Sequence, residues 1–225
     1  MRLSLALILA FAAAPALAAE RSFPVGDFEQ IVLTGSTDVR VTTGGRVSVV
    51  AEGAAADLDR MDIRVDGKRL LIGTKKGSGK WSSREGVKVR VSVPKLSAAT
   101  ISGSGDIGIN RVSGPFGGRI SGSGDMDIAS VDSPALSLAV SGSGDIDVGG
   151  GRCGQGSFTT TGSGEIDAAR VRCETVSATV TGSGNIDAQA TGTAALNVTG
   201  SGNVVVTGGA RCTTRTTGSG TTRCS

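Results

Sequence analysis

Residues 136–148 read LSLAVSGSGDIDV, and this pattern returns along the chain every eighteen to twenty residues. A Gly-Ser-Gly triplet lies at its centre and begins at Gly103, Gly122, Gly142, Gly162, Gly182, Gly200 and Gly218. Self-similarity at a fixed period of this length is typical of solenoids, in which each repeat forms one coil and stacks on the next. The repeat therefore predicts the architecture of most of the chain.

Two short strands flank each triplet. Before it, apolar and small polar residues alternate as in residues 136–141, with the period of two of a half-buried strand. After it, carboxylates alternate with inward apolar residues, as in residues 145–148. The two glycines permit backbone angles that other residues avoid, so the chain can turn sharply between the strands. We predict an all-β, single-domain parallel β-solenoid, right-handed, with coils of about 20 residues.

The region before the array, residues 19–96, is rich in strand signals but less regular. Residues 31–41 resemble one degenerate coil, with Gly35 at the triplet position and Asp38 at the carboxylate position, and we interpret them as the first rung. We expect residues 19–96 to form an amino-terminal β cap and the first coils, continuous with a seven-repeat β-solenoid over residues 97–225.

Three local signals lie within this amino-terminal region. Asp66-Gly67 predicts a two-residue hairpin loop, because both residues tolerate positive φ. Residues 87–93 alternate as a strand that Pro94 ends. Residues 75–84 form a basic Gly/Ser loop that holds Trp81, the only tryptophan. This loop is either simply solvated or a contact site for an acidic surface.

Residues 1–18 predict a cleaved signal peptide. An apolar run from Leu3 to Ala14 follows Arg2, and Ala16-Leu17-Ala18 offers the small residues that signal peptidase accepts, so we place cleavage after Ala18. No later stretch approaches the roughly 18 apolar residues that cross a bilayer. We therefore expect an exported protein without a membrane span or lipid anchor, periplasmic or secreted to the cell surface.

Charge and composition exclude several classes of function. Lys and Arg together exceed Asp and Glu by three, which is too small an excess to indicate nucleic-acid binding. The chain has no histidine, so metal sites built on imidazole and triads with a histidine base are excluded. Although Gly occurs 36 times, Ile, Val and Leu recur at regular positions, which favours ordered β-structure over disorder.

The four cysteines predict two disulfides, as in most exported proteins. Cys153 and Cys173 each fall eleven residues after the first Gly of their own triplets, so stacked coils bring them to about strand spacing. Cys212 and Cys224 lie six residues before and six after Gly218, at inward positions of the last coil. A bridge there would staple the open end of the solenoid, where threonines replace apolar core residues.

Two rows of outward polar residues are the candidate sites. One row comprises Asp106, Asp125, Asp145, Glu165, Asn185 and Asn203, and the second comprises Asp127, Asp147, Asp167 and Asp187. Carboxylates at strand spacing repel one another, so they need solvent, hydrogen-bond donors or a cation. The candidate Ca²⁺ ligands are Asp125, Asp127, Asp145, Asp147, Glu165 and Asp167.

Three interpretations of these rows stay open. The first-row side chains can accept hydrogen bonds from backbone N–H groups at the glycine corner, a role that Asn185 and Asn203 would fill equally well. Bound Ca²⁺ and a catalytic carboxylate pair are the other two. The Ser and Thr residues in and beside the triplets form a third ladder, which could stack as structure or present a flat recognition face.

Several segments resemble one known family. The run from Phe28-Glu29-Gln30-Ile31 through Val93-Pro94-Lys95-Leu96 into residues 101–107 is similar to the putative autotransporter adhesin head domain, called the GIN domain, and Gly108-Ile109-Asn110 contains that literal triplet. The resemblance covers nearly all of the chain after about Phe23. It implies a bacterial, exported β-solenoid, and it carries over no catalytic residue.

We expect a non-enzymatic, adhesin-like or cell-envelope scaffold protein, because a rod with regular polar faces offers an extended surface. It would use no catalytic residue and no cofactor, and its partner would be a protein or glycan at the cell envelope or surface. A polysaccharide lyase or hydrolase is the enzyme alternative, supported by fold analogy alone and weakened by the absence of tyrosine. A Ca²⁺-stabilised or ice-binding solenoid is the third possibility, resting on the carboxylate and hydroxyl ladders.

Overall fold

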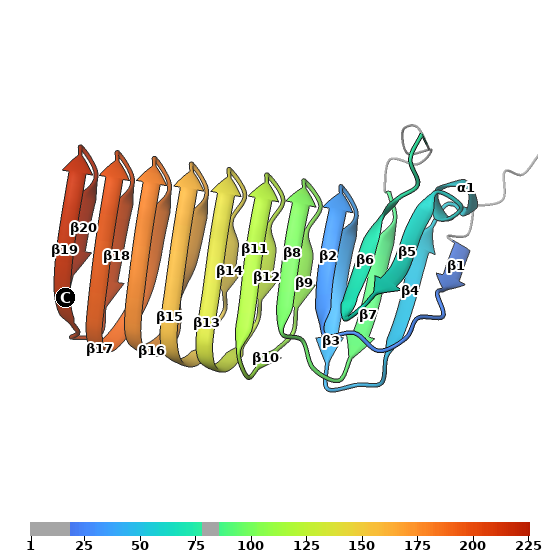
Figure 1. The fold of residues 1–225 in the computed structure, drawn as a ribbon, viewed down its shortest axis with the longest axis horizontal. Helices are drawn as coiled ribbons and strands as arrows, with labels where there is room; N and C mark the ends of the chain where they lie inside the picture. Colours follow the sequence, from blue (N-terminus) through green and yellow to red (C-terminus); the bar gives the residue numbers. More distant parts are fainter. Residues whose placement is uncertain (1–18, 78–85) are drawn as a thin grey trace, which may run out of the picture.

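The computed structural model describes residues 19–77 and 86–225. They form an elongated rod of stacked, flattened coils, with one short helix near its amino-terminal end (Figure 1). The predicted all-β parallel solenoid is confirmed. The predicted signal peptide at residues 1–18 and Trp81 in the basic loop lie outside the described residues. In the part that is described, no helix is long and apolar enough to cross a membrane.

Each coil contributes strands to two broad faces of the rod. Face A is the outer surface over the strands that precede the glycine corner, and face B is the outer surface over those that follow it. Face A is built on β6 (Arg69–Thr74), β2 (Gln30–Gly35), β8 (Ala98–Gly103), β11 (Phe116–Gly122), β13 (Val131–Gly142), β15 (Gly151–Gly162) and β19 (Arg211–Gly218). Face B is built on β7 (Lys88–Val93), β3 (Asp38–Thr43), β9 (Ile107–Ile109), β12 (Met126–Ile128), β14 (Ile146–Val148), β18 (Asn203–Thr207) and β20 (Thr221–Cys224).

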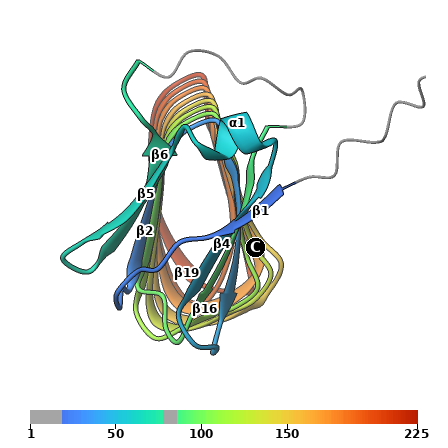
Figure 2. The same ribbon diagram turned by 90° about the vertical axis from the view of Figure 1, so that its right-hand side faces the viewer.

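Three further strands complete the stack. β16 (Glu165–Gly182) and β17 (Asn185–Gly200) each run without interruption from face B around the lower edge into face A, whereas β10 (Val112–Ser113) covers only that edge. Seen from the amino-terminal end (Figure 2), the chain rises along face A, crosses the glycine corner and descends along face B while moving away from the viewer. The coils therefore wind right-handed, as predicted.

The repeat fixes the register of neighbouring coils. Strands pair in parallel so that Gly142 lies beside Gly122 on one side and Gly162 on the other. On face B, Ile146 lies between Met126 and Ile166 in the same way. Because like residues stack on like residues, the inward positions form continuous apolar columns at the strand spacing of about 4.8 Å. The core is therefore narrow and runs the length of the rod.

Large and small inward residues compensate one another within this core. Phe158 is 1% exposed, and a Cβ placed on Gly156 would come within 2.9 Å of its ring. Similarly, a Cβ on Gly118 would lie 2.9 Å from Leu138 and 3.4 Å from Phe116. Each bulky ring thus occupies the space that a neighbouring glycine leaves free, which keeps the coil cross-section constant.

The two glycines of each triplet have different roles. Gly142 has φ 130°, a conformation that L side chains rarely adopt. Gly144 has no positive φ, but a Cβ placed on it would lie 2.1 Å from the carbonyl oxygen of Gly124 in the preceding coil. The prediction that both glycines supply unusual backbone angles is therefore wrong for the second one. It is required because the stacked corners approach too closely for any side chain.

The amino-terminal coils are not stacked in chain order. Gly35 lies beside Gly103, and β3 pairs with β9, so residues 31–41 form a coil in the predicted register. On its other side, however, this coil pairs with β6 and β7, which come later in the sequence. Residues 31–41 are thus the second rung and not the first, because the chain returns to add residues 69–93 outside them.

Antiparallel strands and a helix close the amino-terminal end. β5 (Met61–Asp66) extends face A beyond β6, while β4 (Ser48–Gly53) and then β1 (Ala19–Ser22) extend face B beyond β7. Helix α1 (Ala55–Leu58) links β4 to β5 and buries Leu58. Because Asp66 pairs with Arg69, the hairpin loop is Gly67-Lys68 and not the predicted Asp66-Gly67. Only Gly67 has positive φ, which fits a turn with glycine at its first central position.

Two disulfides join the predicted cysteines. Cys153 and Cys173 connect β15 to β16 in adjacent coils, with their Cα atoms 4.4 Å apart. Cys212 and Cys224 connect β19 to β20 within the last coil, with their Cα atoms 6.4 Å apart. Thr214 and Thr216 point inward in that coil but are exposed, since no further coil covers them. The second bridge therefore ties the two faces together at the open end.

Candidate binding face

The first polar row of face B is a hydrogen-bonded ladder between coils. One carboxylate oxygen of Asp106 accepts a hydrogen bond from the backbone N–H of Asp125, at 2.9 Å. Asp125 accepts one from Asp145 at 2.9 Å, and Asp145 accepts one from Glu165 at 2.8 Å. The donors therefore come from the residue after the corner of the next coil, not from the corner glycines. Each carboxylate links two coils.

Amide and hydroxyl groups continue this row toward the carboxyl terminus. The side-chain NH₂ of Asn203 donates to the side-chain oxygen of Asn185 at 3.1 Å, and the Thr221 hydroxyl donates to the Asn203 side-chain oxygen at 2.7 Å. The backbone N–H groups of these residues instead bond to glycine carbonyls of the preceding coil, as in Asn203 N–H to Gly184 at 3.2 Å. Asn thus serves the same inter-coil contact through a different atom.

The second row concentrates negative charge, and its one ion pair in the described chain joins Asp167 to Arg170 at 3.8 Å. Asp127 and Asp147 lie side by side on paired strands, as do Asp147 and Asp167, and Asp167 and Asp187. Partial burial, followed by the charges of Asp167 and Asp127, raises the pKa of Asp147 above its usual value. Burial and then the charge of Asp167 raise the pKa of Asp187 in the same direction. Repulsion along the row is therefore built into the fold.

These carboxylates form lines and not a cage. Within residues 19–77 and 86–225, no three or more acidic or cysteine side chains converge on a point where they could hold a metal ion. The candidate residues Asp125, Asp145 and Glu165 lie in one row, and Asp127, Asp147 and Asp167 lie in the other. Calcium binding along these rows stays a prediction, as does a catalytic carboxylate pair.

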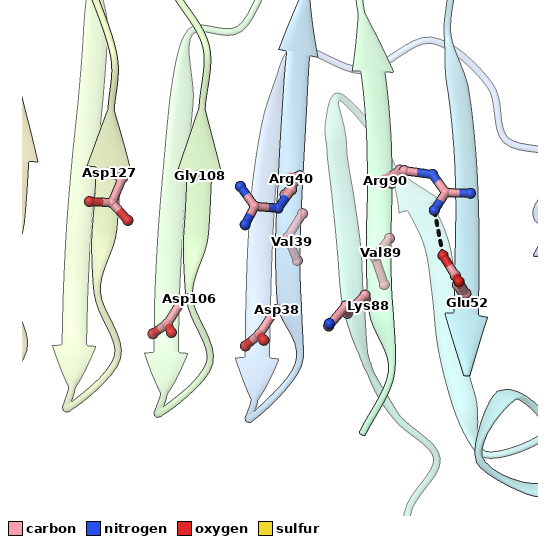
Figure 3. Close-up of a pocket in the computed structure, with 10 residues that line it drawn as sticks. All are labelled: Asp38, Val39, Arg40, Glu52, Lys88, Val89, Arg90, Asp106, Gly108 and Asp127. Carbon is pink, nitrogen blue, oxygen red and sulfur yellow. Dashed lines mark hydrogen bonds and ion pairs between the residues drawn. The ribbon is translucent and has the colours of Figure 1, made fainter. Parts of the chain in front are cut away.

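A groove opens near the amino-terminal end of face B, where the side-chain charge of the second row changes from negative to positive. In this row Arg40 and Arg90 occupy the positions that aspartates occupy in later coils, and Gly108 lies between Arg40 and Asp127. A hollow of about 290 Å³ lies here. Lys88, Asp38 and Asp106 line its end nearest the glycine corner, which is the lower end in Figure 3. The groove therefore places cationic and anionic side chains on opposite sides of one glycine.

The cations of the groove differ in their pairing. Arg90 donates to Glu52 at 2.6 Å and also to Glu20, and these two carboxylates raise its pKa further. Arg40 makes no ion pair within the described chain, and its guanidinium lies across Gly108, with Nη1 3.9 Å from where a Cβ of that glycine would be. Figure 3 shows Arg40 pointing toward β9 and Arg90 pointing away toward Glu52. Of the two arginines in the groove, Arg40 is thus the one left available to a ligand.

The sequence contained one signal for this groove. Four later repeats carry Asp at the position of Gly108, namely Asp127, Asp147, Asp167 and Asp187. The sequence Gly108-Ile109-Asn110 indicates only the family resemblance. Asn110 has a structural role, because its side-chain oxygen accepts a hydrogen bond from the backbone N–H of Thr43 at 2.9 Å. Arg40 and Lys88 could not be grouped with Gly108 until the strand pairing was known.

Face A carries the third ladder. Its outward positions beside the corner hold hydroxyl residues on successive paired strands, and those residues are exposed: Ser102, Ser121, Ser141, Thr161, Thr181, Thr199 and Thr217. Small side chains at strand spacing give a flat surface. The Ser and Thr row therefore lies on the opposite face of the rod from the charged rows.

Comparison with known proteins identifies relatives of this chain. Residues 27–210 match the family described as "Putative auto-transporter adhesin, head GIN domain". No curated protein matched. A solved "putative adhesin" from Bacteroides fragilis is 22% identical, with a TM-score of 0.88 over 93% of this chain and 98% of that chain.

Two solved structures from Parabacteroides distasonis share the fold. One is a "putative lipid binding protein", 21% identical, with a TM-score of 0.74 over 94% of this chain and 98% of that chain. The other is a "putative adhesin", 22% identical, with a TM-score of 0.75 over the same shares of the two chains. At these identities the likeness extends to the fold alone.

Proposed function

Because this chain belongs to the family described as "Putative auto-transporter adhesin, head GIN domain", we propose that it acts outside the cytoplasm as an adhesin-like binding protein without catalytic chemistry. Its partner would be a protein or glycan of the cell envelope or a cell surface. The observation that carries the proposal is the constant register of the coils, which repeats the same outward side chains along one rigid face.

A periodic face suits adhesion for a physical reason. Each coil adds one more row of contacts at the same spacing, so a repetitive or extended partner can engage several rows at once. Once one row is bound, the neighbouring contacts become intramolecular, and overall avidity exceeds the affinity of any single row. The rod is also rigid because each coil is hydrogen-bonded to the next throughout its length. Little conformational entropy is then lost on binding.

Export is supported by two features of different kinds. Residues 1–18 carry the predicted signal peptide, and both disulfides are formed in the structure, which agrees with an oxidising compartment. Fractionation of the producing bacterium, with detection of the protein in cytoplasmic, periplasmic, membrane and culture fractions, tests this part. Recovery in the cytoplasm alone would contradict it.

Two other functions have less support. Lipid binding, the role named for one Parabacteroides protein, would need apolar space, but the interior between the two faces is filled by buried side chains such as Phe158, Leu138 and Ile146. Polysaccharide cleavage would need one distinctive acid and base pair, whereas the acidic side chains of face B repeat from coil to coil. Incubation with polysaccharides and an assay for new reducing ends would reveal such an activity.

Adhesion itself is tested with the purified, oxidised protein. We expect labelled protein to bind arrays of glycans and envelope proteins or intact bacterial and host cells, saturably and without altering the ligand. The heat-denatured protein, in which the repeated face is lost, serves as the control. Failure to bind any of these surfaces would overturn the adhesin proposal.

A further inference from the structure

The groove at Gly108 has the features of a ligand site rather than of a packing defect. The four consecutive coils of β12, β14, β16 and β17 all present an aspartate at this position. By contrast, β9 presents a glycine in ordinary strand conformation. A Cβ there would meet only Arg40 within 4 Å. A side chain would therefore fit, so its absence is not required by the fold and leaves an open notch over the backbone.

Arg40 faces this notch, and residues 19–77 and 86–225 offer it no ion-pair partner. Its neighbours across the strand pairs are Arg90, which is engaged by Glu52 and Glu20, and Gly108, which has no side chain. A planar guanidinium presents a fork of donors that matches a carboxylate in two parallel hydrogen bonds. An exposed, unpaired guanidinium beside a notch is thus a ready contact for an anionic group of a ligand.

Carboxylates around the rest of the groove select against a simple anion. Asp127 lies on the far side of Gly108, and Asp38 and Asp106 lie two residues before Arg40 and Gly108 on their strands, about 6.6 Å away along the chain. Ionised carboxylates accept hydrogen bonds and donate none. A ligand must therefore offer an anion on the Arg40 side and hydroxyl or other donors on the aspartate side. A phosphodiester supplies only the first, and a polyamine supplies only the second.

We propose that this groove binds the acidic sugar units of a glycan, with the sugar carboxylate on Arg40 and ring hydroxyls donating to Asp106 and Asp127. A pyranose ring joins a carboxylate to several hydroxyls within the width of the groove, so a single unit can contact both walls. The inference rests on the proposed adhesin function and names the class of its partner. At the end of the groove nearest the glycine corner, Lys88 points toward Asp38 in Figure 3 and adds positive charge on the Arg40 side.

The groove also extends in the direction that a glycan chain would follow. A second hollow of about 410 Å³ shares Arg40, Gly108 and Asp127 with the first and continues over Asp147 and Gly149. The two hollows meet at the notch and run along the rod axis. An oligosaccharide can thus place an acidic unit at Arg40 and further hydroxyls against the aspartate row, whereas a single sugar uses only the first hollow.

Titration of the ¹⁵N-labelled, oxidised protein tests the site directly. The probes are a tetrasaccharide of galacturonic acid, sialyllactose, and their neutral counterparts, the carboxyl-reduced tetrasaccharide and lactose. We expect an acidic probe to shift the backbone amides of Arg40, Gly108 and Asp127, with the neutral counterpart at least about tenfold weaker. The acidic probe that binds more tightly distinguishes uronic from sialic acid sources. No shift with either acidic probe, or equal binding of the neutral ones, overturns the proposal.

Substitutions in the groove test whether binding takes place there. Gly108→Asp restores the side chain of the neighbouring coils, fills the notch and pairs with Arg40, so binding should be lost while the unfolding temperature is unchanged. Arg40→Gln should weaken binding about tenfold or more. The matched controls lie on face A: Gly117→Ser, at an open position whose neighbour is Ser137, and Arg119→Gln, an exposed arginine. Equal losses in variants and controls would also overturn the site.

The same variants separate this inference from the proposed function. If the protein adheres to cells or arrays and Gly108→Asp adheres equally well, the adhesin function stands and the sugar site fails. If acidic sugars shift the groove amides but the protein adheres to no surface, the site stands and the adhesin function fails.

Discussion

The side chain of Asp125 accepts a hydrogen bond from the backbone N–H of Asp145, which is twenty residues later in the sequence but adjacent in the stack. This contact ties one coil to the next at the corner. We expect Asp125→Ala to destabilise the protein by about 1 kcal/mol, because the N–H of Asp145 loses its acceptor. Asp125→Asn should lose less, since its amide oxygen still accepts. Chemical denaturation of the two variants measures the difference, and equal losses would contradict it.

Asp147 should respond to pH in the opposite sense from most surface carboxylates. Its pKa is raised by burial and by Asp167 and Asp127, so its charge costs stability at neutral pH and this cost disappears as the pH falls through the raised value. Asp147→Asn should therefore stabilise the protein at pH 7 by a few tenths of a kcal/mol after solvent screening. At about pH 3, below the ordinary aspartate pKa, the two proteins should be equally stable.

Urea denaturation at both pH values checks this expectation. Asp132 supplies the control, because its hydrogen bond and ion pair with Arg152 at 2.9 Å lower its pKa. Asp132→Asn should bring no gain at pH 7. A stabilisation of both variants, or of neither, would show that charge repulsion along the row is not the cause.

The second glycine of the triplet should be intolerant of any side chain. A Cβ on Gly124 would lie 2.1 Å from the backbone oxygen of Gly105 in the adjacent coil, and a backbone atom cannot rotate away. Gly124→Ala should lower stability by at least about 2 kcal/mol or prevent folding. Gly117→Ala, where a Cβ meets nothing within 4 Å, should change stability by less than about 0.5 kcal/mol. Thermal unfolding by circular dichroism compares them.

Thr160 offers a substitution that should stabilise the protein. It is 0% exposed, its hydroxyl has no hydrogen-bond partner among the described residues, and it lies in a core column between Val140 and Val180. Thr160→Val replaces an unsatisfied hydroxyl by a methyl group of similar size, with an expected gain of about 1 kcal/mol. The neighbouring Thr159 is exposed, so Thr159→Val should be neutral. A loss of stability in Thr160→Val would indicate a bound water at the hydroxyl.

The two disulfides should differ in their reactivity toward reductant. Cys153 and Cys173 are 6% and 1% exposed, whereas Cys212 and Cys224 are only partly buried at the open end. Mild reduction of the folded protein should open the terminal bridge first, because thiolate attack requires access to the sulfur. Timed alkylation followed by peptide mass spectrometry gives the order. Simultaneous opening would mean that the last coils unfold together.

The solenoid could be predicted in detail from the sequence because successive repeats have nearly the same length and pair residue by residue. Once Gly142 is placed beside Gly122, every residue in both coils has its neighbour, and the Cys153–Cys173 pair follows from the same count. The placement of β6 and β7 outside β2 and β3 could not be predicted, because it depends on pairing between segments that do not resemble one another. A repeat specifies register only where it is present.

The candidate groove was missed for a related reason. It arises from a side chain that is lacking at Gly108 and from Arg40, which belongs to a coil without a complete triplet. Inspection of the repeats ranks residues that recur, so it favoured the aspartate rows. A position at which a repeat lacks the recurring residue gives a weaker signal, and the role of Gly108 depends on Arg40, which lies beside it only through strand pairing.

The order of the amino-terminal strands also sets the direction in which this rod can assemble. The first coil in the sequence, β2 with β3, has partners on both sides, so it begins with two open edges. Residues 69–93 and the antiparallel strands beyond them close one edge, and all later coils add to the other. All residues of the blocked end precede the array in the chain, so they are synthesised before it. Later coils then have a single free edge on which to stack, and the last of them carries its own disulfide.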